Sequence, residues 1–158
     1  MRMNTDIEDI DLSADVPLDA FLRRVSRIIE NRFDETGEVP PSWALVTAAG
    51  KAHLVVTPFP ATAEDPCGDN AKKAGVAFMR DYFREHDVVR YAFAAEGWQG
   101  AKSASVRPSM DPNRTEVMAL IAEDRDGAIT ASREIIRSTN GKPYLGKLEL
   151  DDGPHAPG

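Results

Sequence analysis

The stretch that decides the fold is residues 114–137, RTEVMALIAEDRDGAITASREIIR. Its centre, Asp124-Arg125-Asp126-Gly127, is a strong hairpin signal, because an Asp-Gly pair tolerates the positive φ angles of a tight turn. The residues on either side, 114–123 and 128–138, are rich in apolar and β-branched side chains. We therefore predict two antiparallel strands that pair across this turn.

Two more strands are expected beside this hairpin, which makes a β-meander. Residues 88–98 alternate bulky with smaller side chains, as a strand with one packed face does. A long loop over 99–113 connects this strand to the hairpin. After the hairpin, a turn at Asn140-Gly141 leads to a last strand over 144–150.

The amino-terminal half is predicted to contain two helices and two strands. Between Pro17 and Gly37 the apolar residues recur at helical spacing: Leu18, Phe21, Leu22, Val25, Ile28, Ile29 and Phe33. Two short strands follow, over 43–49 and 52–57, and then a proline-containing loop over 58–68. A second helix is expected from Asp69 to about His86.

The predicted order of elements is α-β-β-α-β-β-β-β. This order gives an α+β fold with an antiparallel sheet of five to six strands and two helices in packed layers. In its first seven elements it resembles the profilin and roadblock class. A single domain is expected over residues 17–150.

The acidic residues are concentrated at the two ends of the chain. The formal net charge is −7, of which residues 1–16 contribute −4 and residues 151–158 contribute −2. Both ends are therefore predicted to be flexible tails. The near-neutral remainder makes nucleic acid an unlikely partner, because binding a phosphate backbone requires a basic face.

The composition indicates a soluble cytoplasmic protein. The 158 residues are 42% hydrophobic and 28% charged, and no apolar run is long enough for a membrane helix. The first residues lack the apolar core of a secretory signal. Cys67 is the only cysteine, which excludes an intrachain disulfide and fits a reducing compartment.

The hairpin register brings several charged residues to one end of one sheet face. Pairing across the turn sets Glu116 opposite Ile135 or Arg137, and places Arg114 and Arg133 on the same face. Glu96 on the preceding strand can join them, and Trp98 can form an aromatic wall. The candidate ligand-binding residues are Glu96, Trp98, Arg114, Glu116, Arg133 and Arg137.

Two interpretations of this cluster stay open. The arginines can grip the carboxylate or phosphate of a small anionic ligand. The favoured interpretation is a solvated sheet face held by cross-strand ion pairs, each contributing about 0–1 kcal/mol to stability.

The strand over 114–123 is apolar on both faces at its middle. Met118 and Leu120 lie on one face, and Val117, Ala119 and Ile121 lie on the other. Either each face is covered by one helix, or both helices share a face and a second subunit covers the other. The second arrangement predicts a homodimer.

No metal site and no cofactor are predicted. His53, His86 and His155 are scattered and form no ligand spacing with Cys67 or the acidic residues. Cys67 also has no histidine beside it in any recognisable motif, so an unreactive thiol is expected.

The segments YAFAAEGW (91–98), RTEV (114–117), AEDRDG (122–127) and REIIR (133–137) are similar to a set of uncharacterised bacterial and phage-associated proteins. That set has a Glu-x-Trp strand, an Arg-x-Glu strand and an Asp-Gly hairpin. The likeness spans roughly residues 40–150 and implies a domain type without an activity.

Three functions are compatible with these observations. The leading hypothesis is a non-catalytic binding or protein-interaction module of bacterial or phage origin. The alternative is a small enzyme acting on an anionic metabolite, which requires the cluster to line a concave pocket and one carboxylate pKa to be raised by burial. A third is an accessory protein whose acidic tails contact a basic partner.

Overall fold

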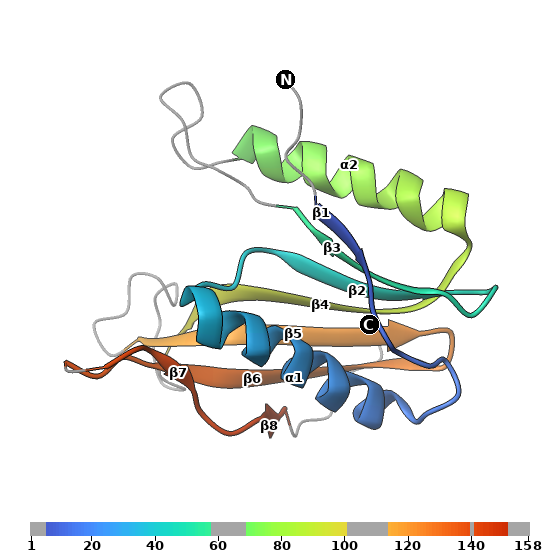
Figure 1. Cartoon of the computed structure of the whole chain (residues 1–158). Helices are drawn as coiled ribbons and strands as arrows, with labels where there is room; N and C mark the ends of the chain where they lie inside the picture. Colours follow the sequence, from blue (N-terminus) through green and yellow to red (C-terminus); the bar gives the residue numbers. More distant parts are fainter. Residues whose placement is uncertain (1–5, 58–68, 101–113, 140, 152–158) are drawn as a thin grey trace.

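The computed structural model describes residues 6–57, 69–100, 114–139 and 141–151. Helices α1 (Leu18–Thr36) and α2 (Asp69–His86) accompany eight strands: β1 (Asp6–Asp9), β2 (Ser42–Thr47), β3 (Ala52–Val56), β4 (Val88–Gln99), β5 (Thr115–Asp124), β6 (Gly127–Ile136), β7 (Tyr144–Leu145) and β8 (Glu149–Leu150). The strands form one antiparallel sheet in the order β1-β3-β2-β4-β5-β6-β7, and β8 also pairs with β6 (Figure 1). The predicted α+β class with two helices is confirmed.

The predicted number of strands, five to six, is too low. The strand expected over 144–150 is divided into β7 and β8, which pair with different parts of β6. The other strand that was not predicted is β1, because its four residues contain a single apolar side chain and show no strand pattern.

Strand β1 lies within the acidic segment for which a flexible tail is predicted. Its residues pair with β3 from Val56 to His53, and the Ile10 N–H continues the ladder to the Ala52 carbonyl at 3.1 Å. Glu8 forms an ion pair with Arg32 of α1. Residues 6–9 are therefore a strand of the sheet, held by backbone hydrogen bonds that any sequence can make.

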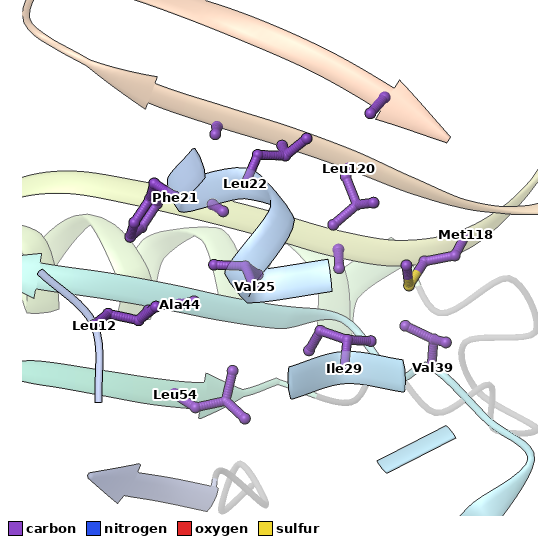
Figure 2. Packing of buried hydrophobic residues seen from close by; sticks show 14 of the residues in the cluster. Leu12, Phe21, Leu22, Val25, Ile29, Val39, Ala44, Leu54, Met118 and Leu120 are labelled. Atoms are coloured by element: carbon purple, nitrogen blue, oxygen red, sulfur yellow. The ribbon is translucent and has the colours of Figure 1, made fainter. Parts of the chain in front are cut away.

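Helix α1 begins after Pro17 and ends where Gly37 adopts a left-handed conformation at φ 75°. The Gly37 N–H donates to the Phe33 carbonyl at 2.7 Å, which satisfies one of the free carbonyls at the helix end. The buried side of α1 packs on the sheet, as Figure 2 shows for Leu22, Val25 and Ile29 beside residues of β2, β3 and β5. This packing forms the main core.

Helix α2 packs on the opposite face of the sheet. Ala44 and Val46 of β2 belong to the core beneath α1, whereas Leu45 between them packs with Met79 and Tyr82 of α2. Neighbouring residues of a strand point to opposite faces, so each helix has a face of its own. Figure 1 shows α2 displaced towards the β1–β3 edge. Of the two predicted arrangements, the structure has one helix on each face.

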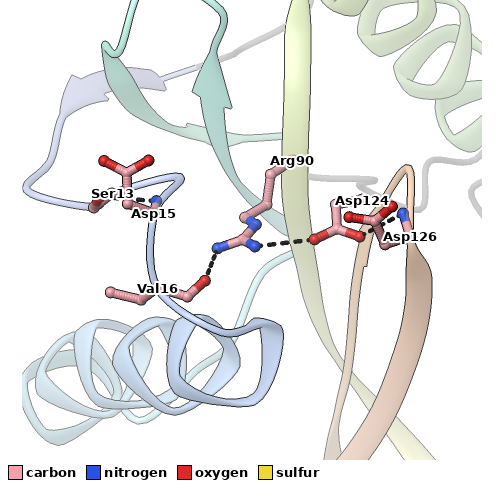
Figure 3. A network of polar contacts seen from close by, with 6 residues as sticks. All are labelled: Ser13, Asp15, Val16, Arg90, Asp124 and Asp126. Carbon is pink, nitrogen blue, oxygen red and sulfur yellow. Dashed lines mark hydrogen bonds and ion pairs between the residues drawn. The ribbon is translucent and has the colours of Figure 1, made fainter.

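A buried arginine ties the segment before α1 to the hairpin. Arg90 of β4, 8% exposed, donates to the Val16 carbonyl and pairs with Asp124 at 3.0 Å (Figure 3). Its guanidinium also lies 5.2 Å from the ring centre of Phe21. Arg90 thus links three parts of the chain that are distant in sequence.

Candidate functional site

Of the two predicted registers, the hairpin has the one that continues to Glu116 opposite Ile135. Val117 pairs with Glu134, and Asp124 pairs with Gly127. This register sets Arg137 diagonally across from Glu116, within reach of a long side chain. Nε and Nη2 of Arg137 donate to the two carboxylate oxygens of Glu116 at 2.8 and 2.7 Å. The predicted cross-strand ion pair is therefore present and bidentate.

Glu96 lies near this ion pair on the neighbouring strand β4, where its backbone is opposite Met118. One of its carboxylate oxygens accepts the Val39 N–H at 3.3 Å. Burial raises the pKa of Glu96, and so do the nearby charges of Glu116 and Glu38, although the Val39 N–H and Arg137 act in the opposite sense. The hydrogen bonds from Arg137 lower the pKa of Glu116. The pKa values of the two carboxylates are therefore shifted in opposite directions.

Arg133 is occupied by protein groups on the side of α1. Its Nη2 donates to Glu30 at 2.8 Å and its Nη1 to the Ser26 hydroxyl at 3.2 Å, both on α1. Its Nε donates to the Gly146 carbonyl at 2.6 Å. Through these hydrogen bonds the Arg133 guanidinium joins α1, β6 and the turn after β7. We therefore assign Arg133 a structural role.

Arg114 and Trp98 form a separate contact at the end of β4. The Arg114 guanidinium lies 4.5 Å from the ring centre of Trp98, a cation–π geometry. Trp98 is 45% exposed. Within the described residues Arg114 has no carboxylate partner. Of the three candidate arginines, it is the one without a hydrogen bond to another described residue.

An open hollow lies on the α2 side of the sheet, over the parts of β4, β5 and β6 that α2 does not cover. Its volume is about 410 Å³. Strand alternation places seven residues of β4, β5 and β6 on this surface, which we call the open face: Phe93, Ala95, Val117, Ala119, Ile121, Thr130 and Ser132. Trp98 is the only member of the candidate cluster among the described residues that line the hollow. The two carboxylates Glu96 and Glu116 do not line it.

A histidine pair joins β3 to α2, and the sequence carried no signal for it because the two residues are far apart in the chain. The rings of His53 and His86 lie 6.1 Å apart between centres, and Tyr82 lies 4.1 Å from His86. Nδ1 of His53 is buried and lies 3.2 Å from Asp9 without hydrogen-bond geometry. Across the described ranges, no three His, Cys, Asp or Glu side chains are arranged to hold a metal ion. Cys67 and His155 lie outside these ranges.

No helix in the described part of the chain is long and apolar enough to cross a membrane. No family model, curated protein or solved structure matches the chain.

Proposed function

We propose that this chain is a non-catalytic interaction module that self-associates through the open face of its sheet. The observation that carries the proposal is that neither described helix covers that part of the sheet. Helix α2 packs over β2, β3 and the start of β4, and among the described residues no helix lies over the hollow on β4, β5 and β6. In the opposite layer, α1 buries its side of β4, β5 and β6.

The centre of the open face is apolar and partly exposed. Ala119 is exposed, and Phe93, Ala95 and Ile121 are half-buried. Removing such surface from water favours association by about 25 cal/mol per Å² of apolar area. The composition of this face therefore supports an interaction site.

A second copy of the chain fits this surface because the centre of the open face is uncharged. A two-fold interface sets the same patch against itself, so a charge at its centre would meet a like charge. The acidic residues Glu123 and Glu134 lie on the same face at its margins, and Asp151, which lines the hollow beside β6, accepts a hydrogen bond from the Thr130 hydroxyl at 2.6 Å. All three are exposed to solvent. Their repulsion is therefore screened.

The small side chains of the open face suit the packing of one sheet on another. Ala95 lies opposite Ala119, and Ser132 lies opposite Ala119 on the other side. Stacked sheets in proteins lie about 10 Å apart, with side chains of the two inner faces interdigitating. A row of small residues between Phe93 and Val117 leaves room for larger side chains of the second copy.

An enzyme acting at the Glu96 and Glu116 cluster is the weaker candidate. The raised pKa of Glu96 supports it, since a carboxyl with a raised pKa holds its proton to a higher pH than an ordinary glutamate does. A substrate also needs a concave site beside both carboxylates. The hollow is lined by Trp98 and not by either carboxylate.

Sedimentation equilibrium tests the proposal. The wild-type chain is expected to show a concentration-dependent approach to twice its mass. Ala119→Arg places a charge at the centre of the open face and is expected to give a monomer at every concentration. The matched control is Ala74→Arg, which makes the same change at an exposed position of α2. A wild-type chain that stays monomeric, or a dimer that Ala119→Arg leaves intact, contradicts the proposal.

A further inference from the structure

A second groove lies between α2 and the sheet and shares no residue with the open face. Its volume is about 170 Å³, and it is lined by Trp43, Val76, Met79, Arg80, Phe83 and Tyr91. Val76 is 47% exposed although it is β-branched and apolar. The groove therefore presents an apolar floor to solvent along one side of α2.

The aromatic residues of this groove hold one another in place. The rings of Trp43 and Phe83 meet edge to face with centres 6.0 Å apart, and Phe83 meets Tyr91 at 5.0 Å. Such pairs contribute about 0.5–1.5 kcal/mol beyond their buried area. The groove is thus built before any partner arrives, which lowers the entropy lost on binding.

Three cations border the exposed Val76. Lys72, Lys73 and Arg80 are all exposed, and they lie on the same side of α2 as Val76 because helical neighbours recur every three to four residues. None of the three forms an ion pair with another described residue.

We propose that this groove binds an acidic segment of a partner protein through an apolar anchor. The anchor side chain contacts Val76 and the aromatic wall, and carboxylates on either side of it pair with Lys72, Lys73 and Arg80. Charge complementarity selects the partner: the cations attract a negatively charged segment, and the apolar floor requires a hydrophobic side chain within it. A uniformly charged polymer lacks the second feature.

Fluorescence anisotropy with the full chain tests this inference. The probe is a short labelled peptide with a central leucine flanked by glutamates. Two matched peptides replace the glutamates with glutamine or the leucine with serine. The wild-type chain is expected to bind the first peptide at least about tenfold more tightly than either of the other two, because charge and anchor are both required. Equal affinity for the glutamine peptide overturns the proposal.

Charge-matched variants separate the groove from general electrostatics. Lys72→Glu combined with Arg80→Glu is expected to lower the affinity at least about tenfold. The control is Arg23→Glu combined with Arg27→Glu, which makes the same charge change at exposed positions of α1, away from the groove. Equal losses in the two double variants mean that net charge alone attracts the peptide, and the proposal then fails.

Val76→Ser tests the apolar anchor without changing charge, and circular dichroism checks that each variant keeps its helix content. An unchanged affinity for the leucine peptide in Val76→Ser contradicts the anchor. Cosedimentation with vesicles of anionic lipid distinguishes a membrane surface from a protein partner. Binding to the vesicles without binding to the peptide also overturns the proposal. Because the open face is not involved, Ala119→Arg is expected to leave peptide affinity unchanged.

Discussion

The guanidinium of Arg137 meets both carboxylate oxygens of Glu116 from the neighbouring strand, at 2.8 and 2.7 Å. This bidentate contact is the main reason that the pKa of Glu116 lies below its ordinary value. Arg137→Ala is therefore expected to raise the pKa of Glu116, measured by NMR titration of the side-chain carboxyl carbon. Arg114→Ala is the control, and it is expected to leave the pKa of Glu116 in place.

The same pair makes a pH-dependent contribution to stability. Because the folded-state pKa of Glu116 is depressed, its contribution is present above the ordinary glutamate pKa and is lost as the pH falls through the folded-state value. The side chain of Arg137 is 51% exposed, so solvent screens the pair and its contribution is about 0.2–1 kcal/mol. A much larger loss of stability in Arg137→Ala would show that the residue has a further role.

Glu96 has the opposite pH dependence. Burial is the largest cause of its raised pKa. A raised folded-state pKa gives stability that is present below the ordinary glutamate pKa and is lost as the pH rises through the folded-state value. Glu96→Gln keeps an oxygen acceptor for the Val39 N–H and removes the charge. We expect Glu96→Gln to be at least as stable as the wild type at neutral pH.

Urea unfolding of both proteins at neutral and at acidic pH measures this difference. The gain in stability of Glu96→Gln over the wild type is expected to shrink as the pH falls, because protonated Glu96 resembles glutamine. A gain that grows on acidification contradicts the assignment.

Arg90 is predicted to be a charged residue that stabilises the fold. Burial raises the pKa of its partner Asp124, but the hydrogen bonds from the Asp126 N–H and from Arg90 outweigh burial, so the pKa of Asp124 is lowered. Arg90→Ala leaves this carboxylate, whose side chain is 13% exposed, without its cation but with the hydrogen bond from the Asp126 N–H. Losing a charged partner at a largely buried site costs about 1–3 kcal/mol. Urea unfolding is expected to show a loss of this size.

Arg90→Lys serves as the matched variant. It retains the charge but not the fork that reaches Val16 and Asp124 together. An intermediate loss is therefore expected. Equal stability of Arg90→Lys and the wild type would mean that charge alone matters at this position.

Arg133 and Arg114 are expected to differ in how much they contribute to the stability of the fold. Arg133→Ala leaves Glu30 and the Gly146 carbonyl without their donor, and we expect a loss of about 1–3 kcal/mol in urea unfolding. Among the described residues, Arg114→Ala removes an exposed contact with Trp98, and it is expected to stay within about 0.5 kcal/mol of the wild type. Similar losses in the two variants would contradict these separate roles.

The candidate cluster could be predicted only in part. The hairpin was predicted at the right place, but its turn is centred on Arg125 and Asp126, and neither Asp126 nor Gly127 adopts the positive φ expected of an Asp-Gly pair. The position of the turn and strand alternation suffice to bring Glu116 near Arg137. The contacts of Arg133 with Ser26 and Glu30 could not be predicted, because they depend on where α1 crosses the sheet. Long-range packing of a helix leaves no local pattern in either segment.

The chain by itself determined the two helices, the hairpin and the apolar character of both faces of β5, because each follows from spacing along a few neighbouring residues. Only the tertiary structure decided that β1 joins the sheet, that α1 and α2 take opposite faces, and that α2 stops short of the open face. The physical reason is that local periodicity records which side of an element is buried. It does not record which distant element buries it.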